Sequence, residues 1–335
     1  MYSSSFGEFE LIKRLLSHFP KPNKNLLVPP GDDCAAIKIY PDKTLLVTTD
    51  ILIENIHFTQ ASISPRQLGR KAMAVNLSDI AAMGGVPLYA FLSMGLNKRT
   101  EITAFDELIA GMSEMCHRFG VSMSGGDMSA SPGIAIVNIC IIGEALNNKF
   151  LLRSTAQPGD LIQLSGPVGG SAACLNLIME NKPYKHFSTL AKAHFEPEPR
   201  IDVGQALNKL PSVHSMIDIS DGLAQDIGHI CAMSGTGAEI YLENIPLFHE
   251  AEILVEGNYE QSFIWALTGG EDYELCWTVQ PDAEKLALKT AHDAGAPKPA
   301  TIGRITDSPG IRITLNGLEW KNRMNGWDHF KDEVH

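Results

Sequence analysis

The chain has 335 residues, of which 44% are hydrophobic and 20% are charged, and its formal net charge is -12. This composition is typical of a soluble globular protein with one large or two ordinary domains. The acidic balance argues against a nucleic-acid partner, which requires clustered Lys and Arg. No apolar run reaches the roughly 18 residues that a membrane helix needs.

The N-terminal segment predicts an amphipathic helix, because Phe9, Ile12, Leu15, Leu16 and Phe19 recur at helical spacing. No basic region followed by an apolar region occurs there, so we expect no signal peptide and a cytoplasmic protein. The cysteines occur singly and without a C-x-x-C motif, which predicts buried, reduced thiols and argues against a zinc site. They are Cys34, Cys116, Cys140, Cys174, Cys231 and Cys276.

The first half of the chain alternates strand-like and helix-like segments. Residues 43–52 predict a β-strand, and residues 64–85 predict a helix that Ser64-Pro65 opens and Gly84-Gly85 closes. A second helix is expected over residues 103–120. Residues 121–127 and 133–145 predict strands, the second apolar enough to be buried on both faces.

A polar, turn-rich stretch at residues 146–160 predicts a domain boundary, which divides the chain into residues 1–149 and 150–335. The second part opens with a strand, a glycine-rich turn and a helix over residues 160–179. Near the end of the chain, Asn316-Gly317 predicts a β-hairpin. The fold class expected is therefore mixed α/β with two domains.

Acidic residues recur after glycines and at strand ends. Taken alone, each has an ordinary explanation, such as a surface turn for Asp32 and Asp33 or a helix cap for Asp221. The recurrence at separate places in the chain instead predicts that these side chains converge. The acids in question are Asp32, Asp33, Asp50, Asp127, Asp218, Asp221, Glu271 and Asp272.

Asp79 is unusual because its predicted helix is apolar on nearly every face and should be buried. Asn76 lies three residues earlier and shares one side of that helix. A carboxylate in such surroundings is usually paired or bound to a metal. Asp79 is therefore either a hydrogen-bonded core acid or a functional one.

Converging carboxylates require a counter-charge, and oxygen ligands without His or Cys favour Mg²⁺ or Ca²⁺. Residues 218–230 lack the ligand spacing of an EF-hand loop. A magnesium-loaded acidic site is typical of phosphoryl transfer. The phosphate loop and the protein-kinase motifs are absent from the sequence. The glycine-rich segment 166–171 is compatible with phosphate binding or with a tight strand-to-helix turn.

Several motifs resemble the thiamine-monophosphate kinase family, within the superfamily of aminoimidazole-ribonucleotide synthetase. The general superfamily motifs are "NLSDIAAMGG" and "GGD", and the more specific ones are "TTDILIENIHF", "ISDGLAQDIGHI" and "GGEDYEL". The closing "GWDHF" matches as well. The resemblance implies ATP-dependent phosphorylation of thiamine monophosphate to thiamine diphosphate. Several Mg²⁺ ions would mediate direct in-line transfer without a phosphoenzyme. Because the acceptor phosphate oxygen is already anionic near neutral pH, we expect no general base.

The resemblance also implies roles for residues that match the family motifs. Asp33, Asp50, Asp79, Asp127 and Asp218 would be catalytic, and Gly126, Asp127, Arg153 and Ser220 would contact ATP. His57, Glu271 and Trp327 would bind the thiamine substrate. The metal ligands would be Asp33, Thr48, Thr49, Asp50, Asp79, Asp127, Asp218 and Asp221.

The family fold implies a homodimer in which the N-terminal sheets pair across a two-fold axis and the C-terminal domain closes the substrate cleft. Two alternatives remain at this point. One is another ATP-dependent enzyme of the superfamily, such as aminoimidazole-ribonucleotide synthetase, and the other is a non-catalytic nucleotide or metal sensor. No nucleic-acid or membrane partner is expected.

Overall fold

The computed structural model describes residues 8–17, 24–256 and 259–321. Two β-sheets organise this part of the chain, and the first sheet has the strand order β1-β2-β3-β6-β4-β5. All neighbours in it pair antiparallel except β4 and β5. The helices and strands of this half of the chain are α1 (Glu8–Leu16), β1 (Leu26–Val28), β2 (Ala35–Tyr40), β3 (Lys43–Ile53), α2 (Pro65–Ala82), β4 (Val86–Asn97), α3 (Ile102–Phe119), β5 (Ser122–Ser131) and β6 (Ile136–Glu144).

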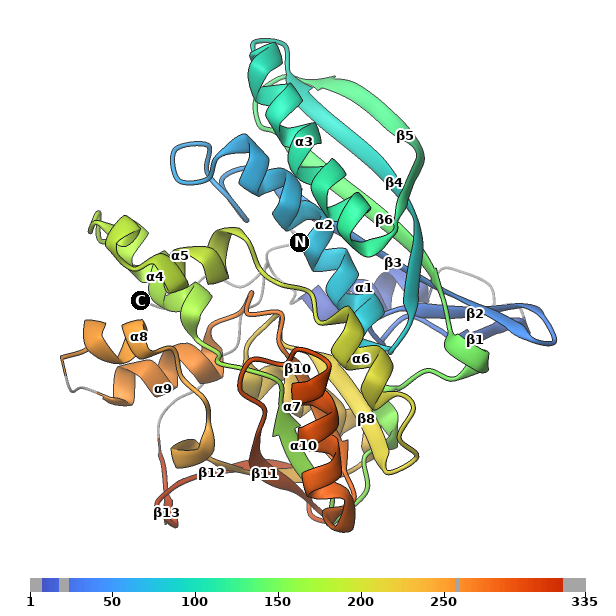
Figure 1. Ribbon diagram of the computed structural model, residues 1–335, viewed down its shortest axis with the longest axis vertical. Coiled ribbons are helices and arrows are strands. Elements are labelled where there is room, and N and C mark those ends of the chain that lie inside the picture. Colours follow the sequence, from blue (N-terminus) through green and yellow to red (C-terminus); the bar gives the residue numbers. More distant parts are fainter. Residues whose placement is uncertain (1–7, 18–23, 257–258, 322–335) are drawn as a thin grey trace.

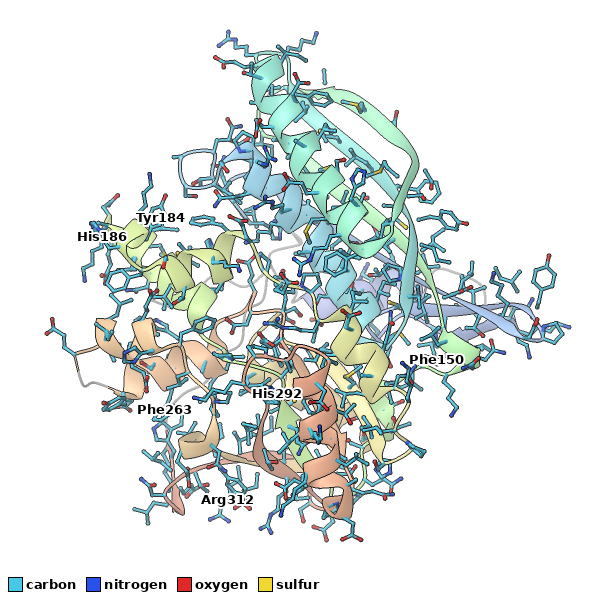
Figure 2. All side chains as sticks on the ribbon, in the orientation of Figure 1. Phe150, Tyr184, His186, Phe263, His292 and Arg312 are labelled. Carbon is cyan, nitrogen blue, oxygen red and sulfur yellow. The ribbon has the colours of Figure 1, made fainter. Side chains whose placement is uncertain are left out.

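The second sheet has seven strands in the order β13-β12-β9-β11-β7-β10-β8. Phe150, in the segment that connects the two sheets, packs on the core (Figure 2). The helices of this half are α4 (Gly170–Met179), α5 (Ser188–Phe195), α6 (Ile201–Leu207), α7 (Leu223–Ser234), α8 (His249–Leu254), α9 (Tyr259–Thr268) and α10 (Glu284–Asp293). Its strands are β7 (Leu161–Leu164), β8 (Val213–Asp218), β9 (Gly237–Tyr241), β10 (Leu275–Val279), β11 (Ala300–Thr306), β12 (Gly310–Leu315) and β13 (Leu318–Glu319).

The predicted start and burial of helix α2 are confirmed. Ser64 and Gln67 form a reciprocal capping box, and Pro65 occupies the first turn. Together with α3, α2 lies against one face of the first sheet (Figure 1). The same helix also contacts α6 and β8 of the second half. Because both halves of the chain cover it, α2 brings its polar residues to the junction between the two sheets.

The prediction for residues 133–145 is only partly right. These residues do form a strand, β6, but its residues alternate between buried and half-exposed positions. Val137, Ile139 and Ile141 are buried, whereas Cys140 and Ile142 are only partly covered. The expectation of burial on both faces is therefore wrong for the single chain, because α2 and α3 cover only one face of the sheet.

Other local predictions are confirmed. Residues 310–319 form the β12–β13 hairpin, and Asn316 and Gly317 have the positive φ angles of 51° and 79° that its turn requires. The N-terminal helix is present as α1, although Ile12, Leu15 and Leu16 are exposed. All six cysteines are free thiols and five are buried, whereas Cys140 is only partly buried, so the predicted burial is wrong there. Within the described residues, no helix combines the length and the apolar character needed to cross a membrane.

Candidate active site

The end of α2 and strand β3 together place Asp79 and Asp50. The hydroxyl of Thr48 on β3 donates a hydrogen bond to Oδ2 of Asp79. Oδ1 of Asn76 accepts the backbone N–H of Asp50 at 3.0 Å. Asn76 and Asp79 therefore both bind β3, the strand that carries Asp50. Their spacing on one side of a buried helix singles them out in the sequence.

Three carboxylates converge from distant parts of the chain. One oxygen each of Asp33, Asp79 and Asp218 lies within 4.8 Å of the others. Asp33 lies in the turn before β2, Asp79 in α2 and Asp218 at the end of β8. We refer to these three residues as the acidic triad. Ser78 donates a hydrogen bond to Oδ2 of Asp218 at 2.5 Å. Oδ1 of Asp218 is buried and has no hydrogen-bond partner among the described residues.

The electrostatics of the acidic triad indicate a deficit of positive charge. Burial, followed by the charges of Asp50, Asp218 and Asp33, raises the pKa of Asp79 well above its usual value. Burial and the charge of Asp33 raise the pKa of Asp218 to about 8. Carboxylates this close are stabilised in their ionised form by a divalent cation, and hard oxygen ligands suit Mg²⁺ or Ca²⁺. The unpartnered oxygen of Asp218 fits such a ligand role.

Arg153 brings a positive charge into contact with the triad. Its side chain makes a two-pronged ion pair with Asp33, with 2.6 Å between Nη2 and Oδ1. Its backbone N–H donates to Oδ2 of Asp32. Burial and the charge of Asp33 raise the pKa of Asp32 to about 7. Arg153, which the sequence predicts to contact ATP, is therefore bound to a member of the acidic triad.

Thr49 and Asp127 lie apart from the triad. Along β3, Thr49 points to the opposite face from Thr48 and Asp50, and its hydroxyl donates to the carbonyl oxygen of Ile139 at 3.1 Å. Asp127 is on the edge strand β5 and is exposed. Strands β6 and β4 separate β5 from β3, which corresponds to about 14 Å at the usual strand spacing. Within one chain, neither residue joins the triad.

The backbone of the same strand requires a glycine at position 126. Its φ angle is +151°, and a Cβ atom there would lie 1.8 Å from the carbonyl oxygen of Leu92. Only glycine permits this approach of β5 to β4.

The loop after β8 is organised by Asp226, a residue that the sequence analysis missed. Its Oδ2 accepts the backbone N–H groups of Ser220, Asp221 and Gly222 at 3.1–3.2 Å. No side chain in the described part of the protein caps the start of α7, so the cap role considered for Asp221 is wrong. Asp221 instead accepts a hydrogen bond from Gln225 and forms a second metal-compatible group with Asp226 and His229.

Glu271 lies beside this loop in a left-handed conformation, with φ of 65°. Its backbone N–H donates to the carbonyl oxygen of Ser220 at 2.8 Å. Against the effect of burial, the charge of Lys71 holds the pKa of Glu271 below its usual value, with smaller contributions from His194 and His57. Nδ1 of His57 accepts the backbone N–H of Ile53 at 3.0 Å. Trp327 lies outside the described residues.

The glycine-rich segment 166–171 forms a tight strand-to-helix turn. Asp272 accepts the backbone N–H of Gly169 at 2.7 Å and that of Ser171 at 3.4 Å. Burial raises the pKa of this carboxyl group to about 8, despite those hydrogen bonds. Two amide groups at the start of α4 are thus already bound by the chain's own carboxylate, which favours the turn interpretation over phosphate binding.

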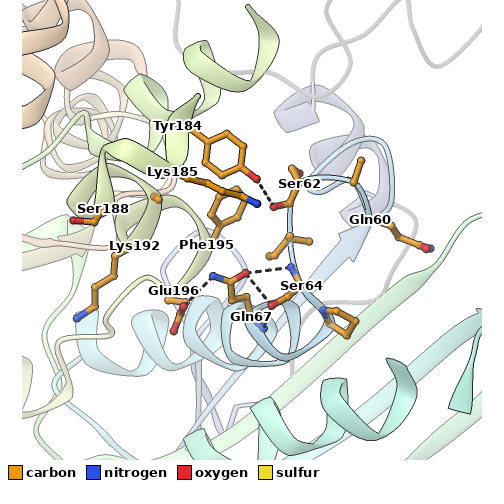
Figure 3. A pocket seen from close by; sticks show the side chains of 14 residues that line it. Gln60, Ser62, Ser64, Gln67, Tyr184, Lys185, Ser188, Lys192, Phe195 and Glu196 are labelled. Atoms are coloured by element: carbon orange, nitrogen blue, oxygen red, sulfur yellow. Dashed lines mark hydrogen bonds between the residues drawn. The ribbon is translucent and has the colours of Figure 1, made fainter. Parts of the chain in front are cut away.

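An open cavity of about 630 Å³ lies between residues 60–67 and the segment 184–196 (Figure 3). The hydroxyl of Tyr184 donates to the carbonyl oxygen of Ser62 across it, at 3.2 Å. Gln67 binds both Ser64 and Glu196 on its wall. Of the described residues that the sequence predicted for the site, none lines this cavity.

Comparisons with known proteins agree with this architecture. The N-terminal domain of AIR synthase related protein matches residues 31–145, and its C-terminal domain matches residues 157–316. Thiamine-monophosphate kinase of Escherichia coli K12 is 38% identical over 336 residues, covering 97% of this chain and 98% of the relative. The Haemophilus influenzae relative of the same name is 36% identical and covers 98% of this chain and 99% of its own length.

Solved structures give the same result. A structure described as AaThiL complexed with AMPPCP and TMP superposes with a TM-score of 0.81 at 31% identity, covering 98% of this chain and 99% of that one. The hydrogenase maturation protein HypE of Escherichia coli shares the fold, with a TM-score of 0.70 at 20% identity over 84% of this chain and 86% of its own. By its sequence and its two AIR synthase related domains, the chain belongs to the thiamine-monophosphate kinase family.

Proposed function

We propose that this chain transfers the terminal phosphoryl group of ATP to thiamine monophosphate, which gives thiamine diphosphate and ADP. The observation that carries the proposal is the acidic triad, whose oxygens lie within 4.8 Å of one another. An anionic nucleotide binds to such a site only when cations occupy it. Full-length similarity to thiamine-monophosphate kinases specifies the acceptor.

Mg²⁺ is the cation we propose, held by Asp33, Asp79 and Asp218, with Asp50 close to Asp79. When bound, it would neutralise charge on the phosphates of both substrates. Ser78 and Thr48 orient the carboxylates that hold it. We propose further ligand roles for Thr48, Thr49, Asp127 and Asp221.

The nucleotide phosphates would be bound by Arg153, whose guanidinium suits phosphate and carboxylate oxygens alike. Gly126, Asp127 and Ser220 would contact the same nucleotide. His57, Glu271 and Trp327 would bind the thiamine part of the acceptor. The acceptor phosphate oxygen is already anionic near neutral pH, so the chain's residues position the reactants and no general base is required.

A homodimer is part of the proposal. The face of the first sheet opposite α2 and α3 carries the exposed apolar side chains Ile51, Tyr89 and Phe91, and a second copy would cover them. Asp127 and Thr49 lie on that face too, next to the proposed interface. We further propose a domain division at residues 149/150 and a cytoplasmic location.

The proposal is tested with purified protein, ATP, Mg²⁺ and thiamine monophosphate, with thiamine diphosphate separated by chromatography. We expect product with Mg²⁺ and none with EDTA. Asp218→Asn should remove most turnover, whereas Asp307→Asn, an exposed acid in the β11–β12 turn, should leave it unchanged. Binding of ATP and metal without diphosphate formation would refute the acceptor and direct attention to the ring-closing chemistry of aminoimidazole-ribonucleotide synthetase.

A further inference from the structure

Lys71 is a buried cation in the middle of α2. Its side chain is 1% exposed, and its Nζ lies 2.9 Å from Oε1 of Glu271. Lysine is rarely buried so completely unless a carboxylate pairs with it. Beyond this ion pair, Nζ has no hydrogen-bond partner among the described residues, although an ammonium group has three donors.

Glu271 is fixed from two sides by this arrangement. Its backbone is bound to Ser220, in the loop that follows Asp218. Its carboxylate faces Lys71 through Oε1 and His194 through Oε2, at 3.6 Å. Nδ1 of His194 lies 2.9 Å from the hydroxyl of Ser171. The carboxylate of Glu271 is thus anchored between α2, α5 and the start of α4.

The charges around Glu271 separate the role of Lys71 from that of His194. Burial alone would raise the pKa of Glu271, but the charge of Lys71, the largest of the lowering effects, keeps it below its usual value. Burial and the charge of Lys71 lower the pKa of His194 to about 4, so this histidine is neutral near pH 7. The basic group paired with Glu271 is therefore Lys71.

We propose that Lys71 is a positioning residue for the acceptor, because its ammonium group holds the Glu271 carboxylate in the orientation that receives an amino group of the substrate's pyrimidine ring. This inference rests on the proposed function, in which Glu271 binds thiamine monophosphate. The Glu271 carboxylate would accept a hydrogen bond from the amino group of the acceptor's ring, and it is not among the residues proposed to contact ATP. Loss of Lys71 should therefore affect one substrate and not the other.

The test uses the full chain with Lys71→Met, whose unbranched side chain is one heavy atom shorter and carries no charge. We expect KM for thiamine monophosphate to rise by about 10- to 100-fold, the range for a lost hydrogen bond to a charged group, while KM for ATP changes less than about twofold. The double variant Lys71→Met/Glu271→Gln should be no weaker for thiamine monophosphate than Glu271→Gln alone. Lys285→Met, on the exposed side of α10, is the matched control.

Two results would overturn the proposal. One is an equal rise in KM for both substrates, and the other is a Lys71→Met effect that adds in full to that of Glu271→Gln. If Lys71→Met does not fold, the double variant, which leaves no unpaired buried charge, and Lys71→Gln provide the same comparison.

Calorimetric binding of thiamine monophosphate separates this proposal from the proposed function. If the wild-type chain binds thiamine monophosphate but forms no diphosphate, the proposed function fails, and Lys71 is judged by its effect on binding alone. If the wild-type chain neither binds nor phosphorylates it, both proposals are refuted.

Discussion

Arg153 and Asp33 form a two-pronged ion pair, in which Nη2 lies 2.6 Å from Oδ1 and Nε lies 3.2 Å from Oδ2. Asp33 belongs to the acidic triad, and we propose Arg153 as a phosphate contact. The planar guanidinium suits both partners, because carboxylate and phosphate oxygens have similar spacing. One side chain thus links the metal-binding and nucleotide-binding parts of the site.

Arg153→Lys should separate charge from geometry at this position. Lysine keeps the positive charge but cannot form the paired hydrogen bonds. We expect KM for ATP to rise by about 10-fold or more, the cost of a hydrogen bond to a charged group, while KM for thiamine monophosphate changes little. Steady-state kinetics measure both values. Arg312→Lys, on an exposed side chain of the second sheet (Figure 2), is the control, and an unchanged KM for ATP would contradict the assignment.

The neighbouring acids Asp32 and Asp33 should differ in importance. The side chain of Asp33 is fully buried and belongs to the triad. Asp32 instead accepts the backbone N–H groups of Arg153 and Asp33, so its role is to hold the turn. Asp33→Asn should lose most turnover and Asp32→Asn should retain part of it, as measured by kcat at saturating Mg²⁺. Equal activity of the two variants would refute this ranking.

Ser78→Ala tests how Asp218 is held. The buried hydroxyl of Ser78 donates to Oδ2 of Asp218 and lowers the pKa of that carboxyl group, against the larger effect of burial. Without this hydrogen bond, the half-saturating Mg²⁺ concentration should rise by about 10-fold, with most of kcat recovered at high Mg²⁺. Ser308→Ala, in an exposed turn, should leave the Mg²⁺ titration unchanged. A loss of kcat that Mg²⁺ does not restore would contradict a role in orienting the ligand.

The sequence could predict elements that are encoded locally. Helix α2 begins at a capping box, and its residues are apolar on nearly every face, so both its start and its burial follow from the residues themselves. The face of β6 that remains uncovered could not be predicted from the strand's composition. Its exposure depends on which helices pack on the sheet, and that is decided by residues far away in the sequence.

The site shows the same limit. The recurrence of acids predicted convergence, and Asp33, Asp79 and Asp218 do converge. Strand alternation alone could have separated Thr49 from Thr48, since adjacent residues in a strand point to opposite faces. Lys71 was missed, although a lysine within a helix predicted to be buried all round was itself a signal. The edge position of Asp127 follows from long-range pairing of β4 with β5, which no local pattern specifies.

The crossing of α2 and α3 predicts a large stability effect at Gly111. A Cβ atom there would lie 2.0 Å from the carbonyl oxygen of Arg66, which belongs to the facing helix and cannot move freely. Gly111→Ala should lower the free energy of unfolding by about 2 kcal/mol or more, because the helices must separate. Gly133→Ala has open space around it and should change stability by less than about 0.5 kcal/mol. Urea unfolding measures the free energy of unfolding of both variants. Similar values for the two would refute the close approach of α2 to α3.

The pH dependence of stability should become weaker when Mg²⁺ binds. Asp218 and Asp272 have pKa values raised to about 8, so near pH 7 the folded, metal-free chain holds protons that the unfolded chain has released. Their contribution to stability is complete below the unfolded value of about 3.9 and is lost as the pH rises through 8. His194, with its pKa lowered to about 4, acts in the opposite direction below its ordinary value of 6.5.

We therefore expect the free energy of unfolding in EDTA to fall between about pH 7 and pH 8.5, where the histidine contribution is constant. Mg²⁺ favours the ionised form of Asp218 but does not contact Asp272, so it should reduce the slope without abolishing it. At about 100 times its dissociation constant, Mg²⁺ should add about 2.7 kcal/mol. Urea unfolding across this pH range, with and without Mg²⁺, measures both effects. Asp218→Asn should show the smaller slope even in EDTA, and a wild-type slope that Mg²⁺ leaves unchanged would argue against metal binding at the acidic triad.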